Sequence, residues 1–217
     1  MSIEKDIGHL RKSYKRGALS DAIKNVSPIS LFEQWFAEAE SHPAIEEANA
    51  MSLVTLGEDN FPKARVVLLK QFSPEGFVLY TNYKSEKGKA LLSHPKVGIS
   101  FFWPALERQV IIKGTAEKVA AEVSDAYFSS RPLGSQLGAI ASNQSEVISS
   151  REVLEERLAD LEATYKDIAP KRPEYWGGVL VRPKQIEFWQ GRPNRLHDRL
   201  RYDLTSVSDW TAERLSP

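Results

Sequence analysis

From residue 50 onward the sequence is dominated by short runs rich in β-branched and aromatic residues, and these runs most constrain the fold. Three of them, Met51–Leu56, Lys63–Phe72 and Phe77–Asn82, are separated by the turn-forming segments 57–60 and 73–76. This order predicts antiparallel strands in a β-meander. The long alternation of strands and helices that a doubly wound parallel sheet requires is missing.

More strands follow the meander. Lys96–Trp103 and Arg108–Val119 predict a hairpin turned at Pro104. Four closing strands are expected at Trp176–Arg182, Gln185–Gln190, Arg195–Leu204 and Trp210–Leu215. Because the open edges of about eight short strands would invite aggregation, the strands must close into a barrel or stack as a sandwich. We therefore predict a mainly β fold with flanking helices, built as an antiparallel, Greek-key-like meander.

The first fifty residues predict an arm followed by a helix. Residues 1–26 are polar and contain six Lys and Arg residues, with one short helix expected at about Ile3–Tyr14. On composition alone this arm is a frayed terminus. Ser30 and Glu33 have the capping-box spacing that starts an amphipathic helix. The remaining residues, 27–217, are expected to form a single domain.

Helices are also expected between the strands. Ser85 is a good N-cap for a short helix that ends near His94. Residues 120–165 follow helical spacing, with a second capping box at Ser149 and Glu152. Residues 166–175 are predicted to form a loop, since they hold two prolines and two lysines.

Composition excludes several classes of protein. Lys+Arg and Asp+Glu both number 29, whereas a general nucleic-acid binder needs an excess of cations. Cysteine is absent, so a redox enzyme built from this chain must carry its electrons on a bound cofactor. The histidines show no metal-ligand spacing, and no metal is expected. No window approaches the ~20 apolar residues of a membrane span, so we predict a cytoplasmic protein with no membrane partner.

Two segments of the meander are candidates for binding anions. Arg65 and Lys70 lie at the ends of an aliphatic strand and project from opposite faces, either as two anion sites or as strand ends that reach water. Thr81, Ser85 and Lys87 surround the start of a helix, where free N–H groups favour a phosphate. An ordinary capped helix fits the second pattern equally well.

Polar residues in the helical middle form a third candidate. Tyr127 and Arg131 are four residues apart and would share a helix face, with Ser135 and the pair Gln144–Ser145 downstream. A phenol, a guanidinium and a hydroxyl on one side would suit a phosphate monoester. A solvated polar face is the alternative.

The segment Gln185–Arg199 is the most informative. If residues 195–199 form a strand, Arg195, His197 and Arg199 point the same way, and such neighbours repel one another. A protein tolerates this when an anion or an electron-rich ligand lies opposite. In a helix, Arg195 and Arg199 would only be neighbours on the surface.

Taken together, these motifs resemble the pyridoxine/pyridoxamine 5′-phosphate oxidase family, from His9–Arg11 to Arg214–Pro217. The likeness is carried by Arg65–Lys70, Tyr80–Asn82, Leu106–Val110, Ser130–Pro132, Gln144–Ser145, Tyr175–Gly178, Gln185–Gly191 and Arg195–Arg199. It implies an FMN-binding split β-barrel that forms a homodimer with FMN at the subunit interface. It also implies oxidation of pyridoxamine or pyridoxine 5′-phosphate by O2 to pyridoxal 5′-phosphate, with release of hydrogen peroxide and, from the amine, ammonia.

The resemblance also implies roles for individual residues. Those expected to bind FMN are Arg65, Val66, Leu68, Tyr80, Thr81, Lys87, Gln109, Gln144, Ser145, Trp189 and Arg199, and Ser85 joins them from its place at the helix start. The substrate phosphate would be held by Lys70, Tyr127, Arg131 and Ser135. Arg195 and His197 are the expected catalytic residues, facing the pyridine ring of the substrate. Arg11 and Tyr14 match arm residues that fold over the occupied site.

One position departs from the family pattern. Where many members have Ser-Arg-Lys at the flavin phosphate, this chain has Ser85, Glu86 and Lys87. A carboxylate beside a phosphate is repulsive. Either Glu86 turns outward, or FMN binding is weaker here.

Three other functions fit parts of the pattern. A non-catalytic carrier of FMN or pyridoxal phosphate would need the phosphate-binding residues but not Arg195 and His197. A split-barrel flavin oxidase or reductase for another substrate would have no use for the residues that hold the substrate phosphate. A barrel that binds single-stranded nucleic acid conflicts with the zero net charge.

Overall fold

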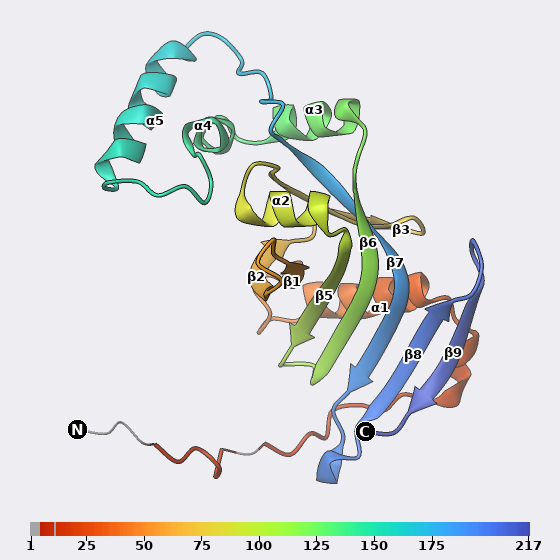
Figure 1. Ribbon diagram of the computed structural model, residues 1–217. Coiled ribbons are helices and arrows are strands. Elements are labelled where there is room, and N and C mark those ends of the chain that lie inside the picture. Colours follow the sequence, from red (N-terminus) through yellow and green to blue (C-terminus); the bar gives the residue numbers. More distant parts are fainter. Residues whose placement is uncertain (1–4, 11) are drawn as a thin grey trace. The chain divides into compact units, whose positions relative to one another are not determined.

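The computed structural model describes residues 5–10 and 12–217 (Figure 1). Contacts between Cα atoms divide the chain into two compact units. Unit 1 comprises Met1–Ala48, Phe101–Ile111 and Gln185–Pro217, and unit 2 comprises Asn49–Ser100 and Ile112–Lys184. Three long strands contribute residues to both units: β5 (Lys96–Trp103), β6 (Arg108–Lys118) and β7 (Trp176–Gln190).

Unit 2 contains a sheet in the order β2-β1-β5-β6-β7-β4-β3. Its other strands are β1 (Ala50–Leu56), β2 (Pro62–Leu68), β3 (Gln71–Ser73) and β4 (Gly76–Asn82). The pairs β1–β2, β1–β5, β3–β4 and β4–β7 are antiparallel. In β1 burial alternates, with Met51, Leu53 and Thr55 facing inward, as expected for a strand with one buried face. The predicted antiparallel fold is confirmed, but the predicted strand Lys63–Phe72 is two strands, β2 and β3, which lie at opposite ends of this order because the extended conformation is interrupted at residues 69–70.

Four helices belong to unit 2: α2 (Glu86–Ser93), α3 (Ala121–Ser130), α4 (Leu133–Ala141) and α5 (Glu152–Thr164). The prediction for α2 is confirmed, since the Ser85 hydroxyl accepts a hydrogen bond from the Gly88 N–H at 3.1 Å. The second capping box is wrong, because Arg151 and not Ser149 precedes α5. Residues 142–151 are rich in Ser and Asn, whose side chains compete for backbone hydrogen bonds and disfavour a continuous helix.

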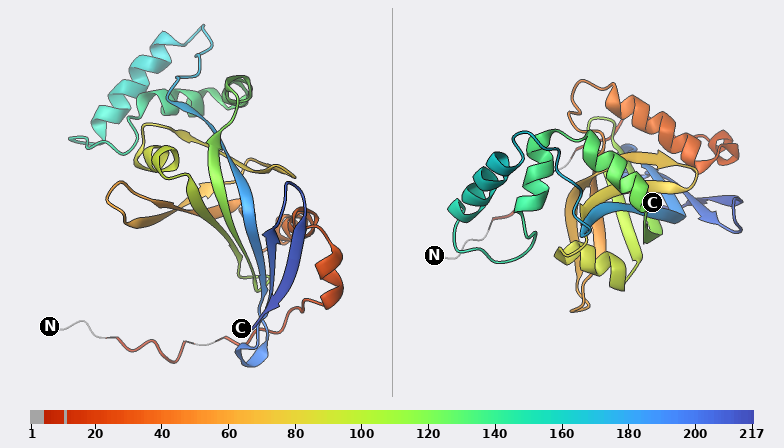
Figure 2. Two further views of the ribbon diagram at one scale, coloured as in Figure 1. Left: turned by 45° about the vertical axis from the view of Figure 1, so that its right-hand side comes forward. Right: turned by 90° about the horizontal axis from the view of Figure 1, so that it is seen from above.

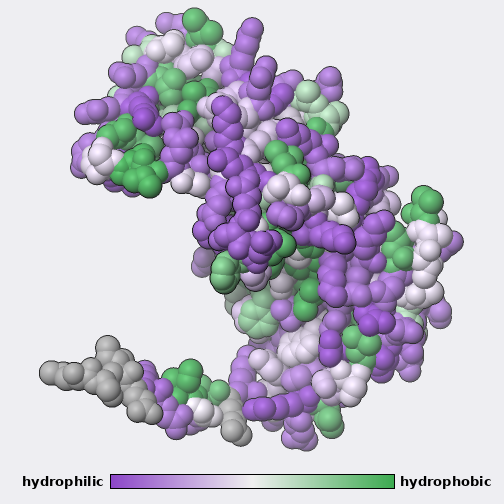
Figure 3. Space-filling view, in the orientation of Figure 1, coloured by the Kyte–Doolittle hydropathy of each residue, from purple (hydrophilic) through white to green (hydrophobic). Residues whose placement is uncertain are grey.

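Helices α4 and α5 lie side by side (Figure 2). No residue of α5 is fully buried, and its valine and leucines, Val153, Leu154, Leu158 and Leu161, are half-buried. Apolar surface is visible over this helix pair (Figure 3), and the exposed apolar side chains here include Leu133, Val147 and Ile148.

Unit 1 is built on helix α1 (Pro28–Glu40), on the unit-1 ends of β5, β6 and β7, and on the last two strands of the chain. The last part of β7 pairs with β8 (Asp198–Leu204), which pairs with β9 (Trp210–Leu215), and both pairs are antiparallel (Figure 1). The predicted aromatic stripe of α1 is confirmed: the ring of Trp35 lies 5.1 Å from Phe188 and that of Phe32 lies 5.1 Å from Phe101. Each such buried side chain stabilises the fold by about 1.5–3 kcal/mol.

Several predictions for unit 1 need correction. Helix α1 starts at Pro28, and its N-cap is Ser27 rather than Ser30, because the fixed φ of Pro28 suits the first helical position. The described residues between 3 and 14 form a turn and no helix, and a 3₁₀-helix follows at Asp21–Asn25. Ile7 and Leu10 are exposed there, and a short helix without packing is marginal in water.

The two strands predicted at 176–182 and 185–190 are one strand, β7. Its pairing with β4 ends at Val181, and its pairing with β8 begins at Gln185. Pro183, which lacks a backbone N–H, lies between these two registers and therefore removes no hydrogen bond from either.

Candidate functional site

The start of α2 in unit 2 gathers two partly buried cations. The Lys87 ammonium donates to Oγ1 of Thr81 at 3.2 Å and to Oε1 of Gln144 at 3.0 Å. Arg65 donates from Nη1 to Oγ1 of Thr55 at 2.7 Å. Burial and the charge of Arg65 lower the pKa of Lys87, and burial lowers the pKa of Arg65. A bound anion would relieve both effects, so this cluster suits a phosphate.

Ser85 and Ser145 lie beside this cluster. The Ser85 hydroxyl is fully buried, donates to the Asn82 carbonyl at 2.6 Å and caps α2, so it stabilises the start of the helix. Ser145 has a left-handed φ of 78° and accepts a hydrogen bond from the Glu86 N–H at 3.2 Å. The loop after α4 is therefore held against the first turn of α2.

Glu86 is paired with a lysine on a neighbouring strand. Its carboxylate oxygens lie 2.6 and 2.8 Å from Nζ of Lys63 on β2. Both side chains are more than half exposed, so the pair is screened by water. Lys63 thus balances the negative charge of Glu86, the residue at which this chain departs from the family pattern.

A second cluster in unit 2 is built on aromatic rings. The Tyr80 and Tyr127 rings stack with centroids 3.7 Å apart, and the Trp176 ring lies parallel to Tyr127 at 6.2 Å. The Arg131 guanidinium carbon lies 4.7 Å from the Trp176 centroid. Burial and the neighbouring Tyr127 raise the pKa of Tyr80, which keeps its phenol neutral.

Arg131 has an unsatisfied donor. Its Nη1 atom is buried and has no hydrogen-bond partner among the described residues. The prediction that Tyr127 and Arg131 share a helix face is wrong, because α3 ends at Ser130 and Arg131 continues in extended conformation with ψ of 150°. Burial lowers the pKa of Arg131 and the Tyr127 phenol raises it, so the two side chains still interact. The free donor suits an anionic ligand.

Other predicted residues of unit 2 lie at the surface. Lys70 and Ser135 are exposed and make no side-chain hydrogen bond within the described part of the chain. Val66 is 69% exposed, and Leu68 is half-buried. The structure therefore brings Tyr127 together with Arg131, but it does not link Lys70 or Ser135 to them.

In unit 1 the predicted arm residue Tyr14 contacts the predicted catalytic region. Its ring lies 5.6 Å from that of Trp189, edge-on at 87°, and 5.7 Å from that of His197. The Trp189 and His197 rings are 4.7 Å apart. Three predicted site residues are thus in contact, whereas Arg11 lies outside the described residues.

The predicted strand at residues 195–199 is wrong. Residues Pro193–Arg195 form a 3₁₀ turn, and β8 begins only at Asp198. Asn194 and Arg195 adopt left-handed φ values of 58° and 62°, which end the extended conformation. Arg195 is exposed, while His197 is half-buried, and the two do not share a strand face with Arg199.

His197 and Arg199 are held by their neighbours. Nδ1 of His197 accepts a hydrogen bond from the Arg192 N–H at 3.1 Å, so a proton of the neutral ring must be on Nε2. Arg199 donates to both carboxylate oxygens of Glu187, at 2.7 and 3.2 Å, and this hydrogen bond raises its pKa. Gln109 lies on β6 and is half-buried.

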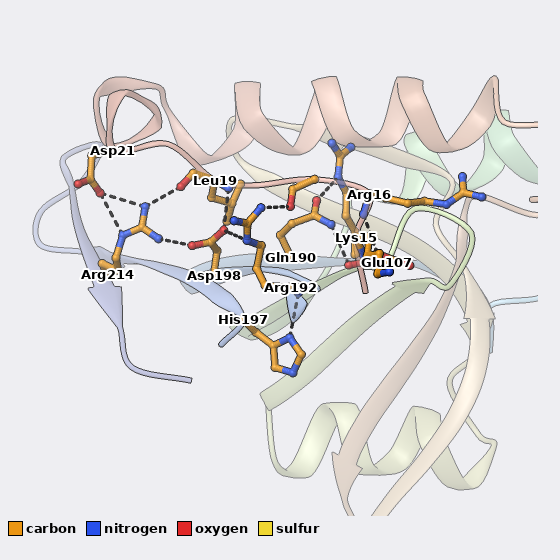
Figure 4. Close-up of polar contacts among 12 residues, drawn as sticks. Lys15, Arg16, Leu19, Asp21, Glu107, Gln190, Arg192, His197, Asp198 and Arg214 are labelled. Carbon is orange, nitrogen blue, oxygen red and sulfur yellow. Dashed lines mark hydrogen bonds and ion pairs between the residues drawn. The ribbon is translucent and has the colours of Figure 1, made fainter. Parts of the chain in front are cut away.

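The arm is also tied down beyond Tyr14 (Figure 4). The Leu19 N–H donates to Asp198 at 3.1 Å, and its carbonyl accepts from Arg214 at 2.7 Å. Arg214 also pairs with Asp198 at 2.8 Å and with Asp21 at 3.0 Å. These contacts fix residues 19–21 against β8 and β9.

Comparisons with known proteins decide the family. The model described as pyridoxamine 5′-phosphate oxidase matches residues 37–165, and that of the pyridoxine 5′-phosphate oxidase C-terminal dimerisation region matches residues 176–217. The chain belongs to the pyridoxine/pyridoxamine 5′-phosphate oxidase family. The resemblance read from the sequence is therefore confirmed.

Members of this oxidase family from two bacteria are close in sequence. The pyridoxine/pyridoxamine 5′-phosphate oxidase of Flavobacterium psychrophilum is 55% identical over 98% of this chain and 100% of that protein. The pyridoxine/pyridoxamine 5′-phosphate oxidase of Flavobacterium johnsoniae is 57% identical over 97% of this chain and 99% of that protein.

Solved structures confirm the split-barrel fold class of this family member. PhzG from Burkholderia lata, in complex with tetrahydrophenazine-1-carboxylic acid, superposes with a TM-score of 0.84 at 28% identity, covering 92% of this chain and 98% of its own. A pyridoxamine 5′-phosphate oxidase-related, FMN binding protein from Nostoc punctiforme has a TM-score of 0.69 at 14% identity, covering 89% and 100%, and shows the fold alone.

Three residues that contact predicted site residues or the arm carry no signal of their own in the sequence. Trp176 supports Arg131, Lys63 pairs with Glu86, and Glu107 contacts the arm. Trp176 and Glu107 do lie within the motifs Tyr175–Gly178 and Leu106–Val110, which was the only available hint. Among the described residues no helix is long and apolar enough to cross a membrane.

Proposed function

We propose that this chain oxidises pyridoxamine 5′-phosphate and pyridoxine 5′-phosphate to pyridoxal 5′-phosphate with FMN as cofactor and O2 as electron acceptor. Pyridoxine phosphate and O2 give pyridoxal phosphate and hydrogen peroxide. The amine also consumes one water molecule and releases ammonia. Family membership and relatives that carry this name support the reaction.

The observation that carries this proposal is the presence of two separate cationic clusters in unit 2. Lys87 and Arg65 form one, and burial lowers the pKa of both. Arg131 forms the other, and its buried Nη1 has no hydrogen-bond partner in residues 5–10 and 12–217. A reaction between a phosphorylated cofactor and a phosphorylated substrate needs two such clusters.

The donor chemistry at the start of α2 fits the phosphate of FMN. Lys87 supplies an ammonium, Arg65 a guanidinium, and Thr81 a hydroxyl, close to the N-terminal end of a helix. We propose that FMN is held by these residues and by Val66, Leu68, Tyr80, Ser85, Gln109, Gln144, Ser145, Trp189 and Arg199, at the interface of a homodimer. When bound, FMN accepts a hydride from the substrate and passes electrons to O2.

The substrate is held through its phosphate. Arg131 and Tyr127 bind it in this proposal, with Lys70 and Ser135 as further donors. Positioning a substrate in reactive geometry can lower the barrier by about 7–11 kcal/mol. The platform of Trp176 and Tyr80 limits the movement of Arg131 and Tyr127 and so serves this positioning.

In unit 1, Arg195 and His197 are the proposed catalytic residues. Arg195 stabilises negative charge that develops on the pyridine or its substituents. His197 can donate from Nε2, because its Nδ1 accepts from the backbone of Arg192. Residues 1–26 act as a lid, with Arg11 and Tyr14 folding over the bound substrate.

The absorption spectrum tests this proposal. Purified protein is expected to be yellow with about one FMN per chain, and mixing it with pyridoxamine 5′-phosphate without oxygen should bleach the flavin. Pyridoxamine, which lacks the phosphate, should bleach it at least about 100-fold more slowly at equal concentration, since it cannot bind the cationic cluster.

Each other outcome points to a different function. Protein that never binds FMN contradicts the proposal. Protein that stays yellow with every B6 compound is a carrier, and protein bleached equally by both amines acts on a substrate without phosphate. Admitting O2 should restore the colour and yield one hydrogen peroxide per pyridoxal 5′-phosphate.

The pair Lys63–Glu86 gives a second test of the cofactor site. Lys63→Met leaves the Glu86 carboxylate unbalanced near the FMN phosphate, so the dissociation constant of FMN should rise about 3–10-fold. Adding Glu86→Gln should restore the wild-type value. Fluorescence titration of the apoprotein with FMN measures this constant.

Lys89→Met is the matched control for this charge change. Lys89 is an exposed lysine of α2 whose loss should leave FMN affinity within about twofold of wild type. Equal weakening by both lysine substitutions, or no recovery in the double variant, would show that Lys63 does not compensate for Glu86.

A further inference from the structure

Glu107 is an acidic residue in an unusual position. It lies in the turn between β5 and β6 of unit 1, with a left-handed φ of 56°, and its side chain is only 4% exposed. Non-glycine residues rarely adopt such a φ, and carboxylates are rarely buried without partners. The partners of this carboxylate therefore indicate why it lies there.

Within the described part of the chain, every hydrogen bond and ion pair of the Glu107 carboxylate is made with the arm. Oε2 accepts hydrogen bonds from the backbone N–H of Lys15 at 2.7 Å and of Arg16 at 2.9 Å (Figure 4). Oε1 lies 3.7 Å from Nζ of Lys12. The two backbone contacts do not depend on the side chains of residues 15 and 16, so the carboxylate fixes the path of the arm itself.

The backbone of Glu107 is tied to the turn that follows β7. Its carbonyl accepts from the Gly191 N–H at 2.7 Å and from Nε2 of Gln190 at 3.2 Å. Nε of Arg108 in turn donates to Oε1 of Gln190 at 2.9 Å. Glu107 therefore connects the arm on one side with residues 190–191 on the other.

The residue just before the clamped backbone is Tyr14. Its ring packs on Trp189 and His197, as described above. There is little room for another arrangement: a Cβ atom on Gly191 would lie 2.7 Å from Cγ of Tyr14. The same fit recurs at Gly17, where a Cβ would lie 2.8 Å from Oε1 of Gln190.

We propose that Glu107 is a positioning residue of the oxidase site. By fixing residues 15 and 16, its carboxylate seats Tyr14 against Trp189 and His197, and the seated arm slows the escape of bound substrate. This inference rests on the proposed function, in which Tyr14 covers the substrate. Glu107 itself contacts neither substrate nor FMN, so it affects retention of the substrate and not the redox step.

The test combines kinetics with limited proteolysis of the FMN-loaded protein. In Glu107→Ala the backbone at residues 15 and 16 is released, so trypsin should cleave after Lys15 and Arg16 about tenfold faster, as mass spectrometry of the fragments would show. The KM for pyridoxamine 5′-phosphate should rise about tenfold, with kcat within about twofold of wild type and FMN content unchanged.

Two further variants separate positioning from general destabilisation. Glu38→Gln removes another carboxylate of unit 1, which pairs with Arg108 at 2.7 Å and forms no hydrogen bond or ion pair with the described residues of the arm, and it should change neither cleavage nor KM. Tyr14→Ala should raise KM, and adding Glu107→Ala to it should raise KM no further, because both act through one contact.

Several results would overturn the inference. These are unchanged cleavage in Glu107→Ala, faster cleavage without a change in KM, or additive effects with Tyr14→Ala. If Glu107→Ala does not fold, Glu107→Gln decides: it keeps one acceptor oxygen and should give intermediate cleavage, and wild-type cleavage would refute the clamp. If wild-type protein binds FMN but oxidises nothing, the proposed function fails, while cleavage still reports on the clamp.

Discussion

Replacing Arg131 with methionine is expected to raise the KM for pyridoxamine 5′-phosphate about 100-fold while FMN content stays unchanged. Its Nη1 atom is buried and has no hydrogen-bond partner among the residues that the structure describes, and its guanidinium lies over Trp176. Losing one partner of a desolvated, charged hydrogen bond weakens binding by about 2–5 kcal/mol. Every ~1.4 kcal/mol of binding free energy changes the dissociation constant tenfold. Pyridoxamine has no phosphate, so its already high KM should not change.

Steady-state kinetics with both amines measures this effect: the difference in KM between pyridoxamine and pyridoxamine 5′-phosphate should become smaller. Arg131→Lys keeps the charge but loses the planar fork, so an intermediate KM is expected. The control is Arg151→Met, which removes an 83% exposed arginine that precedes α5 and pairs with Glu155 of that helix. If Arg131→Met weakened both amines equally, the residue would support the fold and not bind the phosphate.

The strands were predictable because their signals are local. Alternating apolar residues and flanking turn-formers gave the bounds of β5 and β9 as the structure has them. Helix starts were less reliable, because capping boxes recur by chance. Ser85 does cap α2, but at Ser30 the true start lies three residues earlier, where Pro28 favours the first helical position.

The candidate site was predictable to the extent that its residues follow motifs. Thr81, Lys87 and Gln144 were placed together by resemblance, and the structure brings them within hydrogen-bond distance. The geometry around Arg195 was not predictable from periodicity. Pro193 and the left-handed Asn194 form a turn that interrupts the run of β-formers, and propensity averaged over a window misses such a turn.

Partners that are far apart in sequence could not be inferred at all. Glu107 contacts residues of the arm that lie 92 and 91 positions earlier in the chain. Trp176 lies 45 residues after Arg131 and contacts it only once β7 is in the sheet. No local pattern encodes such contacts, because they arise when separate segments pack against each other.

Replacing Lys87 with methionine is expected to raise the dissociation constant of FMN about 100-fold, so that the purified protein is nearly colourless. Lys87 is partly buried beside Arg65 and is the ammonium of the cluster at the start of α2. The loss of one charged partner from a desolvated phosphate site weakens binding by about 2–5 kcal/mol. Lys84→Met is the control, since the exposed Lys84 lies 5.2 Å over the Tyr175 ring instead.

The pH dependence of FMN binding identifies Lys87 independently. Burial and Arg65 lower the pKa of Lys87 in the free protein, whereas a bound phosphate would raise it. Below the lowered pKa the lysine is charged in both states, so this group adds no pH dependence there. As pH rises through the lowered pKa, binding must take up a proton, and affinity falls by up to about tenfold per pH unit.

This fall should begin at a lower pH than an ordinary lysine would give, and it should be absent from the profile of Lys87→Met. Arg65 cannot produce it, because guanidinium groups stay charged over the accessible range. Titration of apoprotein with FMN from neutral to alkaline pH measures both profiles. If the wild-type and Lys87→Met profiles fell in parallel, the titrating group would lie elsewhere, and the phosphate would not be bound by Lys87.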